Sequence, residues 1–231
     1  MTSTSSGFRV AIDGPSGSGK SSVSKKVAAH LGIGYLDTGA MYRALTWYCL
    51  DAGIDLDDTQ AVADAVAAMP LEMGTDPKAP SISMGGNPID SDIRTTRIAE
   101  VVSKVATNLA VRPKLQQRQR ELMAQIAADQ GGVVAEGRDI TTVVAPDAEV
   151  RILMVASEEA RLARRSKEVH GGADESMLAA TRAQIVDRDK ADSTVSQFMT
   201  AADGVVTLDT SELTFQQSVE AVLTLVERAT A

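Results

Sequence analysis

A run of glycines and serines with one lysine follows the first apolar segment of the chain. Residues 14–21 read GPSGSGKS, which matches the pattern G-x-x-x-x-G-K-[ST]. Glycines let backbone N–H groups curl around phosphate oxygens, and the helix that follows points its positive dipole end at the same place. The lysine would reach the β- and γ-phosphates, and the last serine hydroxyl would ligate Mg²⁺. The pattern predicts a nucleoside triphosphate site at Gly14, Pro15, Ser16, Gly17, Ser18, Gly19, Lys20, Ser21 and Ser22.

Three further stretches carry arginine and carboxylate side chains that suit a second anion site. They contain Thr38 and Arg43 (LDTGAMYR, 36–43), Glu136, Arg138 and Asp139 (AEGRD, 135–139), and Arg188 and Asp192 (DRDKAD, 187–192). The planar guanidinium group binds phosphate through two parallel hydrogen bonds. The stretch 135–139 follows a buried strand, and ligands of open α/β sheets bind at that edge. A small-molecule kinase needs such a second site facing the first.

Other uses of a triphosphate site fit the residues less well. A switch GTPase needs a base-reading N-K-x-D, and NPID (87–90) lacks the lysine. A regulatory or RNA-binding protein would use the basic run VRPKLQQRQR (111–120), but the acidic balance of the chain and the lack of interleaved aromatic residues argue against it. A kinase for another acceptor, such as UMP, dephospho-CoA or a small alcohol, stays open on the residues alone.

Composition and charge restrict the partners of the chain. It has 231 residues and a formal net charge of −8, which predicts one domain and no nucleic-acid partner. The first eight residues lack the features of a signal peptide, and no apolar run is long enough for a bilayer span, so we expect a cytoplasmic protein with no membrane partner. The single cysteine, Cys49, predicts a buried free thiol in a reducing compartment. His30 and His170 lie outside every motif.

Strands alternate with helices along the chain. We expect buried strands at 8–12, 34–39, 133–137, 150–156 and 204–210, and helices at 19–31, 40–51, 92–110 and 113–129. Ser157 would cap the helix after the fourth strand, and Thr214 with Gln217 forms a capping box for the last helix. This alternation predicts a doubly wound parallel sheet.

The segment 71–90, LEMGTDPKAPSISMGGNPID, differs from its surroundings. Short apolar pieces alternate with glycine, proline and aspartate turns. Such a pattern predicts a small antiparallel sheet inserted between helices.

Taken together, six stretches resemble the cytidylate kinase family, the bacterial (d)CMP kinases. They are IDGPSGSGKSS, LDTGAMYRA, IRTTRIAEVVSKVA, VRPKLQQRQR, EGRDITTVVAPDA and DRDKADST, and the resemblance covers nearly the whole chain. It implies an α/β P-loop NTPase core with a doubly wound, five-stranded parallel sheet, an inserted antiparallel-sheet region that binds the nucleoside monophosphate, and a helical lid. We therefore expect one domain over 1–231, with its core at 8–37, 130–160 and 200–231, the insert at about 38–112 and the lid at about 160–190.

The resemblance also implies an activity. The enzyme would transfer the γ-phosphate of ATP to CMP or dCMP, giving ADP and CDP or dCDP, in pyrimidine nucleotide metabolism, with Mg²⁺ accompanying ATP. Because the insert and the lid both need free surface to close, we expect a monomer.

Site roles follow from the resemblance position by position. The acceptor phosphate would be held by Thr38, Arg43 and Arg138, the cytosine by Ser103, Arg112 and Asp139, and the ribose and phosphate by Arg188 and Asp192. Lys20, Arg138, Arg188 and Asp192 would be catalytic. The lid arginines that close over ATP would be Arg161, Arg164 and Arg165. Mg²⁺ would be held by Ser21 and, through water, by Glu136.

One departure from the family pattern affects this site. The family reads R-D-x-x-D-S-T-R followed by Pro-Leu, whereas this chain reads RDKADSTVSQF. Val195 thus replaces an arginine, so either one phosphate contact is lost or a lid arginine supplies it. Thr38 stands where the family often has serine, and the hydroxyl is retained.

Overall fold

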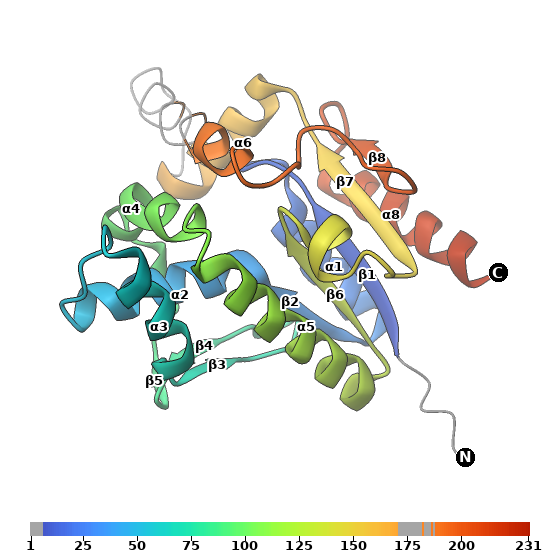
Figure 1. Ribbon diagram of the computed structural model, residues 1–231. Helices are drawn as coiled ribbons and strands as arrows, with labels where there is room; N and C mark the ends of the chain where they lie inside the picture. Colours follow the sequence, from blue (N-terminus) through green and yellow to red (C-terminus); the bar gives the residue numbers. More distant parts are fainter. Residues whose placement is uncertain (1–6, 171–181, 183–185, 187) are drawn as a thin grey trace, which may run out of the picture.

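A five-stranded parallel sheet forms the centre of the protein in the computed structural model, which describes residues 7–170, 182, 186 and 188–231 (Figure 1). The spatial order of the strands is β2-β6-β1-β7-β8, and every pairing is parallel. The strands are β1 (Phe8–Asp13), β2 (Gly34–Asp37), β6 (Gly132–Gly137), β7 (Val150–Val155) and β8 (Val206–Asp209). The parallel sheet expected from the sequence is confirmed.

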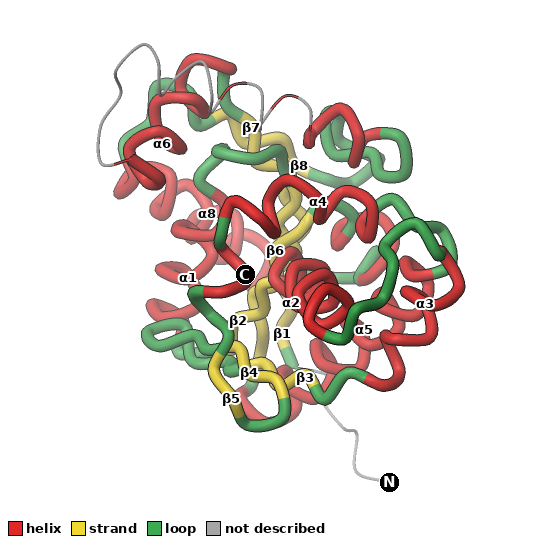
Figure 2. Tube along the Cα trace, turned by 90° about the vertical axis from the view of Figure 1, so that its left-hand side faces the viewer, coloured by secondary structure: helices red, strands yellow, loops and turns green. Residues whose placement is uncertain are grey.

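Helices cover both faces of this sheet. In Figure 2, α1 (Lys20–Leu31) and α8 (Phe215–Thr230) lie on one side, and α5 (Val111–Gln130) lies on the other. Side chains of β1 alternate between the two faces: Val10 and Ile12 pack with α1 and α8, whereas Ala11 packs in the cluster that includes α5. The sheet is therefore the middle layer of a three-layer α/β/α core.

The expected insert is present between β2 and α5. Its elements are α2 (Thr38–Asp51), α3 (Thr59–Ala68), β3 (Leu71–Met73), β4 (Ile82–Met84), β5 (Asn87–Pro88), the 3₁₀ turn η1 (Asp92–Arg94) and α4 (Thr96–Ala106). The three short strands pair antiparallel, as predicted. The insert has its own apolar core, in which Leu45, Val62 and Ile93 are fully buried. Cys49 belongs to this core and is free and buried, as expected.

Two contacts attach the insert to the outer edge of the sheet. The backbone N–H of Tyr35 on β2 donates to the carbonyl of Thr75 at 2.9 Å, and the Gln130 amide donates to the Thr75 hydroxyl at 2.6 Å. β2 is an edge strand, so the loop after β3 takes up a backbone donor that would otherwise face outward.

The structure differs from the sequence-based expectation at three places. Helix α3 has no counterpart in the prediction. The helix expected over 92–110 is divided, because Thr95 adopts an extended backbone between η1 and α4. A short π-helix, η2 (Ile140–Val144), follows β6, and no helix or strand was predicted there.

Helix caps were predicted more reliably. The Ser157 hydroxyl accepts from the Ala160 N–H at 3.2 Å at the start of α6 (Glu158–His170), and both hydrogen bonds of the Thr214–Gln217 capping box are formed. Only part of the expected lid is described, since 171–181, 183–185 and 187 lie outside the described residues; 188–193 are helical. Within the described part of the chain, no helix is both long and apolar enough to cross a membrane.

We predict that Thr214→Ala lowers the free energy of unfolding by about 1 kcal/mol, because the N–H of Gln217 loses its acceptor. Urea denaturation followed by circular dichroism measures the change. Thr224→Ala on the exposed side of the same helix is the matched control and should change stability by less than about 0.5 kcal/mol. Equal effects of the two substitutions would contradict the capping role.

Candidate active site

A cavity of about 880 Å³ lies at the carboxyl edge of the sheet. The carboxyl ends of the strands point toward α4 and α6 in Figure 1, and the loops that follow β1, β2 and β6 all line this cavity. Parallel strands bring their carboxyl ends to one edge, which is why segments far apart in the sequence meet here.

The glycine-rich loop between β1 and α1 forms one end of the cavity. Gly19 begins α1 with φ = 92° and Gly17 has φ = 77°, a region that other residues rarely adopt. A Cβ on Gly17 would also lie 2.7 Å from the carbonyl oxygen of Arg161. The loop therefore needs glycine at both positions to keep its amides turned toward the cavity.

Lys20 and Glu136 are buried together beside this loop. The Lys20 ammonium donates to the Pro15 carbonyl at 3.3 Å and lies 4.0 Å from a carboxylate oxygen of Glu136. Burial lowers the pKa of Lys20, and burial, assisted by the charge of Asp37, raises the pKa of Glu136 to about 7. The Tyr35 hydroxyl donates to the other carboxylate oxygen of Glu136 at 3.0 Å. An anion near Lys20 and a cation near Glu136 would stabilise their charged forms.

Three arginines from different elements line the middle of the cavity: Arg43 on α2, Arg138 after β6 and Arg188 in the helical stretch 188–193. Arg188 lies 3.6 Å from Asp192. Burial lowers the pKa of Arg188 to about 9, and the neighbouring charges of Arg43 and Arg138 add to this effect. An anionic ligand is the natural partner of such a group of cations.

Buried polar atoms in the same place lack hydrogen bonds. Within the described residues, Arg138 Nη1, Arg188 Nε and Asp192 Oδ1 are buried and make none, although Arg138 Nη1 is ion-paired with Asp192 at 2.7 Å. Leaving buried polar groups unsatisfied is costly. Arg138 Nη1 and Arg188 Nε both lie against Asp192 Oδ2, at 2.7 and 3.6 Å, so one carboxylate compensates two cations beside the cavity.

Arg112 and Asp139 form a polar pair at another part of the cavity wall. Arg112 donates to Asp139 Oδ2 at 2.6 Å, to the Ser196 hydroxyl at 2.7 Å and to the Ala106 carbonyl at 2.9 Å. Gln116, one turn further along α5, donates to the same oxygen of Asp139 at 2.7 Å. The pair is thereby held in one orientation while it lines the cavity.

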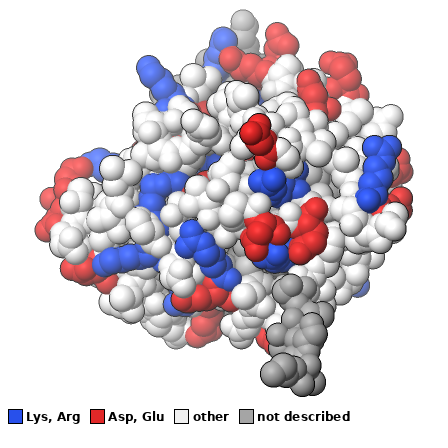
Figure 3. All heavy atoms as spheres, turned by 45° about the vertical axis from the view of Figure 1, so that its right-hand side comes forward, with Lys and Arg blue, Asp and Glu red and all other residues white. Residues whose placement is uncertain are grey.

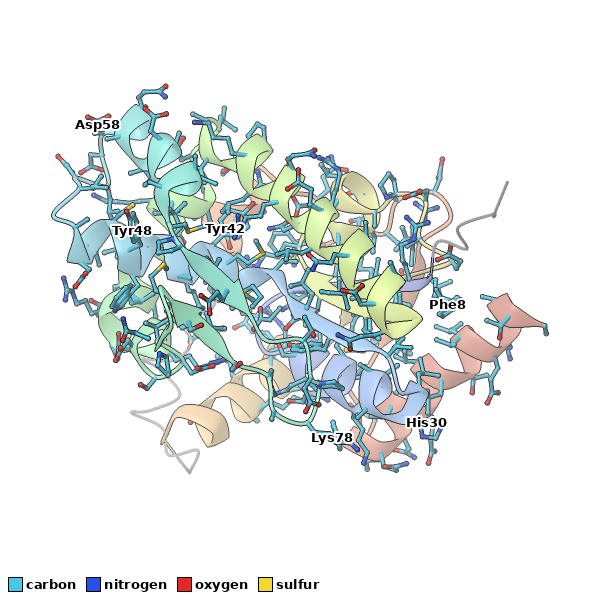
Figure 4. All side chains as sticks on the ribbon, turned by 90° about the horizontal axis from the view of Figure 1, so that it is seen from below. Phe8, His30, Tyr42, Tyr48, Asp58 and Lys78 are labelled. Atoms are coloured by element: carbon cyan, nitrogen blue, oxygen red, sulfur yellow. The ribbon has the colours of Figure 1, made fainter. Side chains whose placement is uncertain are left out.

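Two further residues were predicted to contact the acceptor: Thr38 lines the cavity, whereas Ser103 is not among the residues that line it. Thr38 opens α2, and its hydroxyl donates to the Glu136 carbonyl at 2.7 Å. Ser103 is half-buried on α4 between Ala99 and Ala106, which line the cavity. Tyr42 on α2 also lines the cavity, and it points toward α5 in Figure 4.

The lid arginines have different environments. Arg164 lines the cavity and bonds to the Ser18 carbonyl at 3.2 Å and to Thr210. Arg161 is buried, donates to the Ser16 carbonyl at 3.0 Å and forms an ion pair with Asp189. The side chain of Arg165 is outside the described residues.

Sequence reasoning missed Asp189. Its carboxylate accepts from the Ser16 N–H at 3.2 Å and is ion-paired with Arg138 at 2.9 Å and with Arg161. The residue links the glycine-rich loop to two arginines. The signal was present, since Asp189 follows Arg188 in the motif that was singled out.

Asp13, the last residue of β1, was also missed. Its buried carboxylate accepts from the N–H of Ile140 at 3.0 Å and from the N–H and hydroxyl of Thr141 at 2.7 and 2.6 Å. Asp13 thus fixes the first turn of η2, directly after Asp139. Burial raises the pKa of Asp13 to about 6, and the hydrogen bonds from Thr141 and Ile140 act in the opposite direction.

Apolar residues at the other end of the cavity had no sequence signal. Leu213 lies between β8 and α8, and Phe215 is the first residue of α8. Both line the cavity together with Arg164 and Ser218. Phe215 is 52% exposed, which is high for a phenylalanine. These side chains offer a flat apolar surface beside the glycine-rich loop.

The basic side chains of the run 111–120 form hydrogen bonds and ion pairs with other parts of the protein. Arg112 faces Asp139, Lys114 bonds to Ala63 and Asp64, Arg118 to the Leu71 carbonyl, and Arg120 to the Val143 carbonyl. Acidic and basic side chains are also interspersed on the face shown in Figure 3. These contacts argue against the RNA-binding alternative.

His30, the histidine whose side chain the structure describes, does not line the cavity. His30 is exposed near the end of α1 opposite the glycine-rich loop (Figure 4). The side chain of His170 lies outside the described residues.

Comparison with known proteins gives a consistent result. The family model described as cytidylate kinase matches residues 10–228. The chain is 49% identical to the cytidylate kinase of Streptomyces griseus over 94% of this chain and 92% of that protein. It is 44% identical to the cytidylate kinase of Cutibacterium acnes, over 94% and 95%. A bifunctional pantoate ligase/cytidylate kinase of Synechocystis is 41% identical over 95% of this chain and 42% of that protein.

We predict a pH-dependent effect of Asp13→Asn on stability. Because the folded state raises the pKa of Asp13 to about 6, its titration contributes stability that is complete below pH of about 4 and is lost as the pH rises through about 6. The substitution removes this titration, so it should destabilise more at pH 4.5 than at pH 7, by on the order of 2 kcal/mol.

Urea denaturation at the two pH values measures this difference. Asp129→Asn, at an exposed position on α5, is the control and should have a small effect at both. The same loss of stability at both pH values in Asp13→Asn would contradict the raised pKa.

Proposed function

Because the chain belongs to the cytidylate kinase family, we propose that its cavity binds CMP or dCMP and ATP in line and transfers the γ-phosphate between them. One observation carries the assignment of sites. Two anion-binding groups, the glycine-rich loop with Lys20 and the arginines Arg43, Arg138 and Arg188, face one continuous cavity. Two like-charged reactants can be brought together only where such cations compensate their repulsion.

The acceptor phosphate is assigned to the three arginines and to Thr38. Arg43, Arg138 and Arg188 would supply positive charge and N–H donors to the phosphate. Asp192, which also lines the cavity, would accept from a ribose hydroxyl. The 3′-hydroxyl is present in both CMP and dCMP. The assigned contact between Asp192 and a ribose hydroxyl is therefore open to both nucleotides.

Cytosine is assigned to Arg112, Asp139 and Ser103. Cytosine presents an exocyclic amino donor beside two acceptors, N3 and O2. Both described bonds to Asp139 use Oδ2, so Oδ1 would accept from the amino group, and the Arg112 guanidinium would donate toward the ring acceptors. Uracil would place a carbonyl against the carboxylate and leave both without donors.

ATP is assigned to the glycine-rich loop and the adjoining end of the cavity. Backbone amides of the loop, other than those of Ser16 and Ser18, which are bonded to Asp189 and Pro15, would surround the β- and γ-phosphates together with Lys20. Arg164 reaches this end and is the lid arginine that we place on the donor phosphates, whereas Arg161 acts from behind the loop through Asp189. Leu213 and Phe215 would pack against the adenine ring.

The residues beside Lys20 fit Mg²⁺. Ser21 donates a hydrogen bond to Glu136, so a hydroxyl and a carboxylate oxygen, the ligand type that Mg²⁺ prefers, lie together next to the phosphate loop. Ser21 would hold the ion directly and Glu136 through water. An ion held by these residues would supply positive charge that compensates the negative charge of the donor phosphates. Among the described residues there is no cluster of three or more carboxylate, histidine or cysteine ligands, and this arrangement requires none.

No general base is needed. The nucleophile is a phosphate oxygen whose second pKa of about 6 leaves it ionised at neutral pH. The role of the protein is to align the two nucleotides and to surround the transferring phosphoryl group with Lys20, Arg138 and Arg188. Asp192 and Asp189 hold Arg138 in place.

We also propose that the enzyme acts as a monomer in the cytoplasm. Its one cysteine is buried and free, which suits a reducing compartment.

We expect an acceptor panel to identify CMP and dCMP as the substrates. Formation of ADP from ATP and Mg²⁺ is measured with CMP, dCMP, UMP, AMP, GMP and dephospho-CoA at equal concentrations. The rate with CMP or dCMP should exceed that with every other acceptor, because only cytosine matches Asp139 and Arg112. A higher rate with any other acceptor would overturn the substrate assignment.

We predict that Asp139→Asn lowers the preference for CMP over UMP. The asparagine amide can donate to the uracil carbonyl, so the ratio of kcat/KM for CMP to that for UMP should fall by about tenfold or more, with little change in KM for ATP. Asp129→Asn is the matched control and should leave the ratio as it is in the wild type. An unchanged ratio in Asp139→Asn would remove this residue from base recognition.

A further inference from the structure

Phe198 occupies an unusual environment for an aromatic residue. It is fully buried and is among the largest side chains with no exposure. Yet, within the described residues, it belongs to none of the three apolar clusters that form the cores of the sheet and the insert. A buried ring outside the apolar cores indicates a contact of another kind.

That contact is the guanidinium group of Arg138. Its central carbon lies 4.6 Å from the centroid of the Phe198 ring, within the range of a cation–π interaction. The edges of the guanidinium are held at the same time by the Ser16 hydroxyl at 2.7 Å, by Asp189 at 2.9 Å and by Asp192 at 2.7 Å. The ring covers one face, so the position of the cation is fixed both in its plane and perpendicular to it.

The segment that carries Phe198 also reaches the base-binding end of the cavity. Ser196 is buried, lines the cavity and accepts from Arg112 at 2.7 Å. Asp192, four residues earlier, contacts Arg138. The segment 192–198 therefore contacts Arg138, assigned to the acceptor phosphate, and Arg112, assigned to the cytosine. Ser196 and Phe198 lie just beyond Val195, where the chain departs from the expected sequence pattern.

We propose that Phe198 is a positioning residue for the acceptor phosphate, acting through the electron-rich face of its ring on Arg138. The proposal deepens the proposed function and depends on Arg138 binding that phosphate. Desolvation strengthens a cation–π contact, and both partners are largely buried, Phe198 completely and the Arg138 side chain at 13% exposure. The affinity for the acceptor should therefore follow the electron density of the ring and not only its size.

Fluorination of Phe198 tests this dependence. Site-specific replacement by 4-fluoro-, 3,5-difluoro- and 3,4,5-trifluorophenylalanine withdraws electron density stepwise while the ring stays apolar and nearly constant in shape. We expect KM for CMP to rise with each fluorine, by about tenfold over the series, while KM for ATP and the temperature of unfolding stay within error of the wild type. A packing role alone would leave KM for CMP level across the series, and that result would overturn the proposal.

The same series at Phe8 is the matched control. Phe8 is the first residue of β1, at the end opposite the glycine-rich loop, and packs on the α1 and α8 side of the sheet (Figure 4). Its fluorination should leave KM for both nucleotides unchanged. A parallel rise in KM for CMP at Phe8 would show that the effect is not specific to Arg138 and would count against the proposal.

Phe198→Leu gives a second, independent variant. Leucine keeps an apolar side chain but removes the ring, so KM for CMP should rise at least as much as in the trifluoro variant, with a smaller change in KM for ATP. Equal rises in both KM values would contradict a role confined to the acceptor.

Binding of inorganic phosphate separates this proposal from the substrate assignment. Titration calorimetry of the wild type and the fluorinated variants with phosphate, in the presence of a nonhydrolysable ATP analogue that fills the donor end, reports on Arg138 without using CMP. Weaker phosphate binding along the series would support the role of Phe198 even if the acceptor panel rejected CMP. Phosphate binding that is equal in all variants would overturn the role of Phe198 even if CMP proved to be the substrate.

Discussion

Repulsion between arginines is the constraint on which the rest of this active site depends. Arg43, Arg138 and Arg188 line one cavity, and their mutual effect contributes to the lowered pKa of Arg188. A folded chain can keep such a group only by placing carboxylates among the cations, and Asp189 and Asp192 do this. Asp192 Oδ2 is shared by Arg138 and Arg188, so these two carboxylates compensate the three cations only in part.

The sheet determines where these charges meet. In the register of the parallel strands, Asp37 pairs with Glu136 and Asp13 with Gly137, so three strand ends deliver acidic side chains to one edge. Asp13 then holds the first turn of η2 and, with it, the end of the segment that carries Arg138 and Asp139. The binding loops are thus attached to the most rigid part of the protein, which suits a reaction that relies on alignment.

Patterns confined to short stretches of sequence predicted their structures well. The phosphate loop, the five strands, the antiparallel insert and the capping box at Thr214 all depend on neighbouring residues, and the structure contains each of them. Contacts between distant segments could not be predicted in the same way. Gln116, Ser196 and Phe198 carry no motif, and their partners lie elsewhere in the chain, at Asp139, Arg112 and Arg138. Helix α3 was missed although its alanines favour a helix and Asp58 caps its start.

The bond between Tyr35 and Thr75 has a consequence for the solubility of the protein. An open parallel sheet ends in strands whose unused backbone donors can recruit a strand from another molecule and begin aggregation. β2 is such a strand, and the loop after β3 occupies its Tyr35 donor. The insertion therefore occupies a backbone donor of this edge strand that a strand of a second chain could otherwise use.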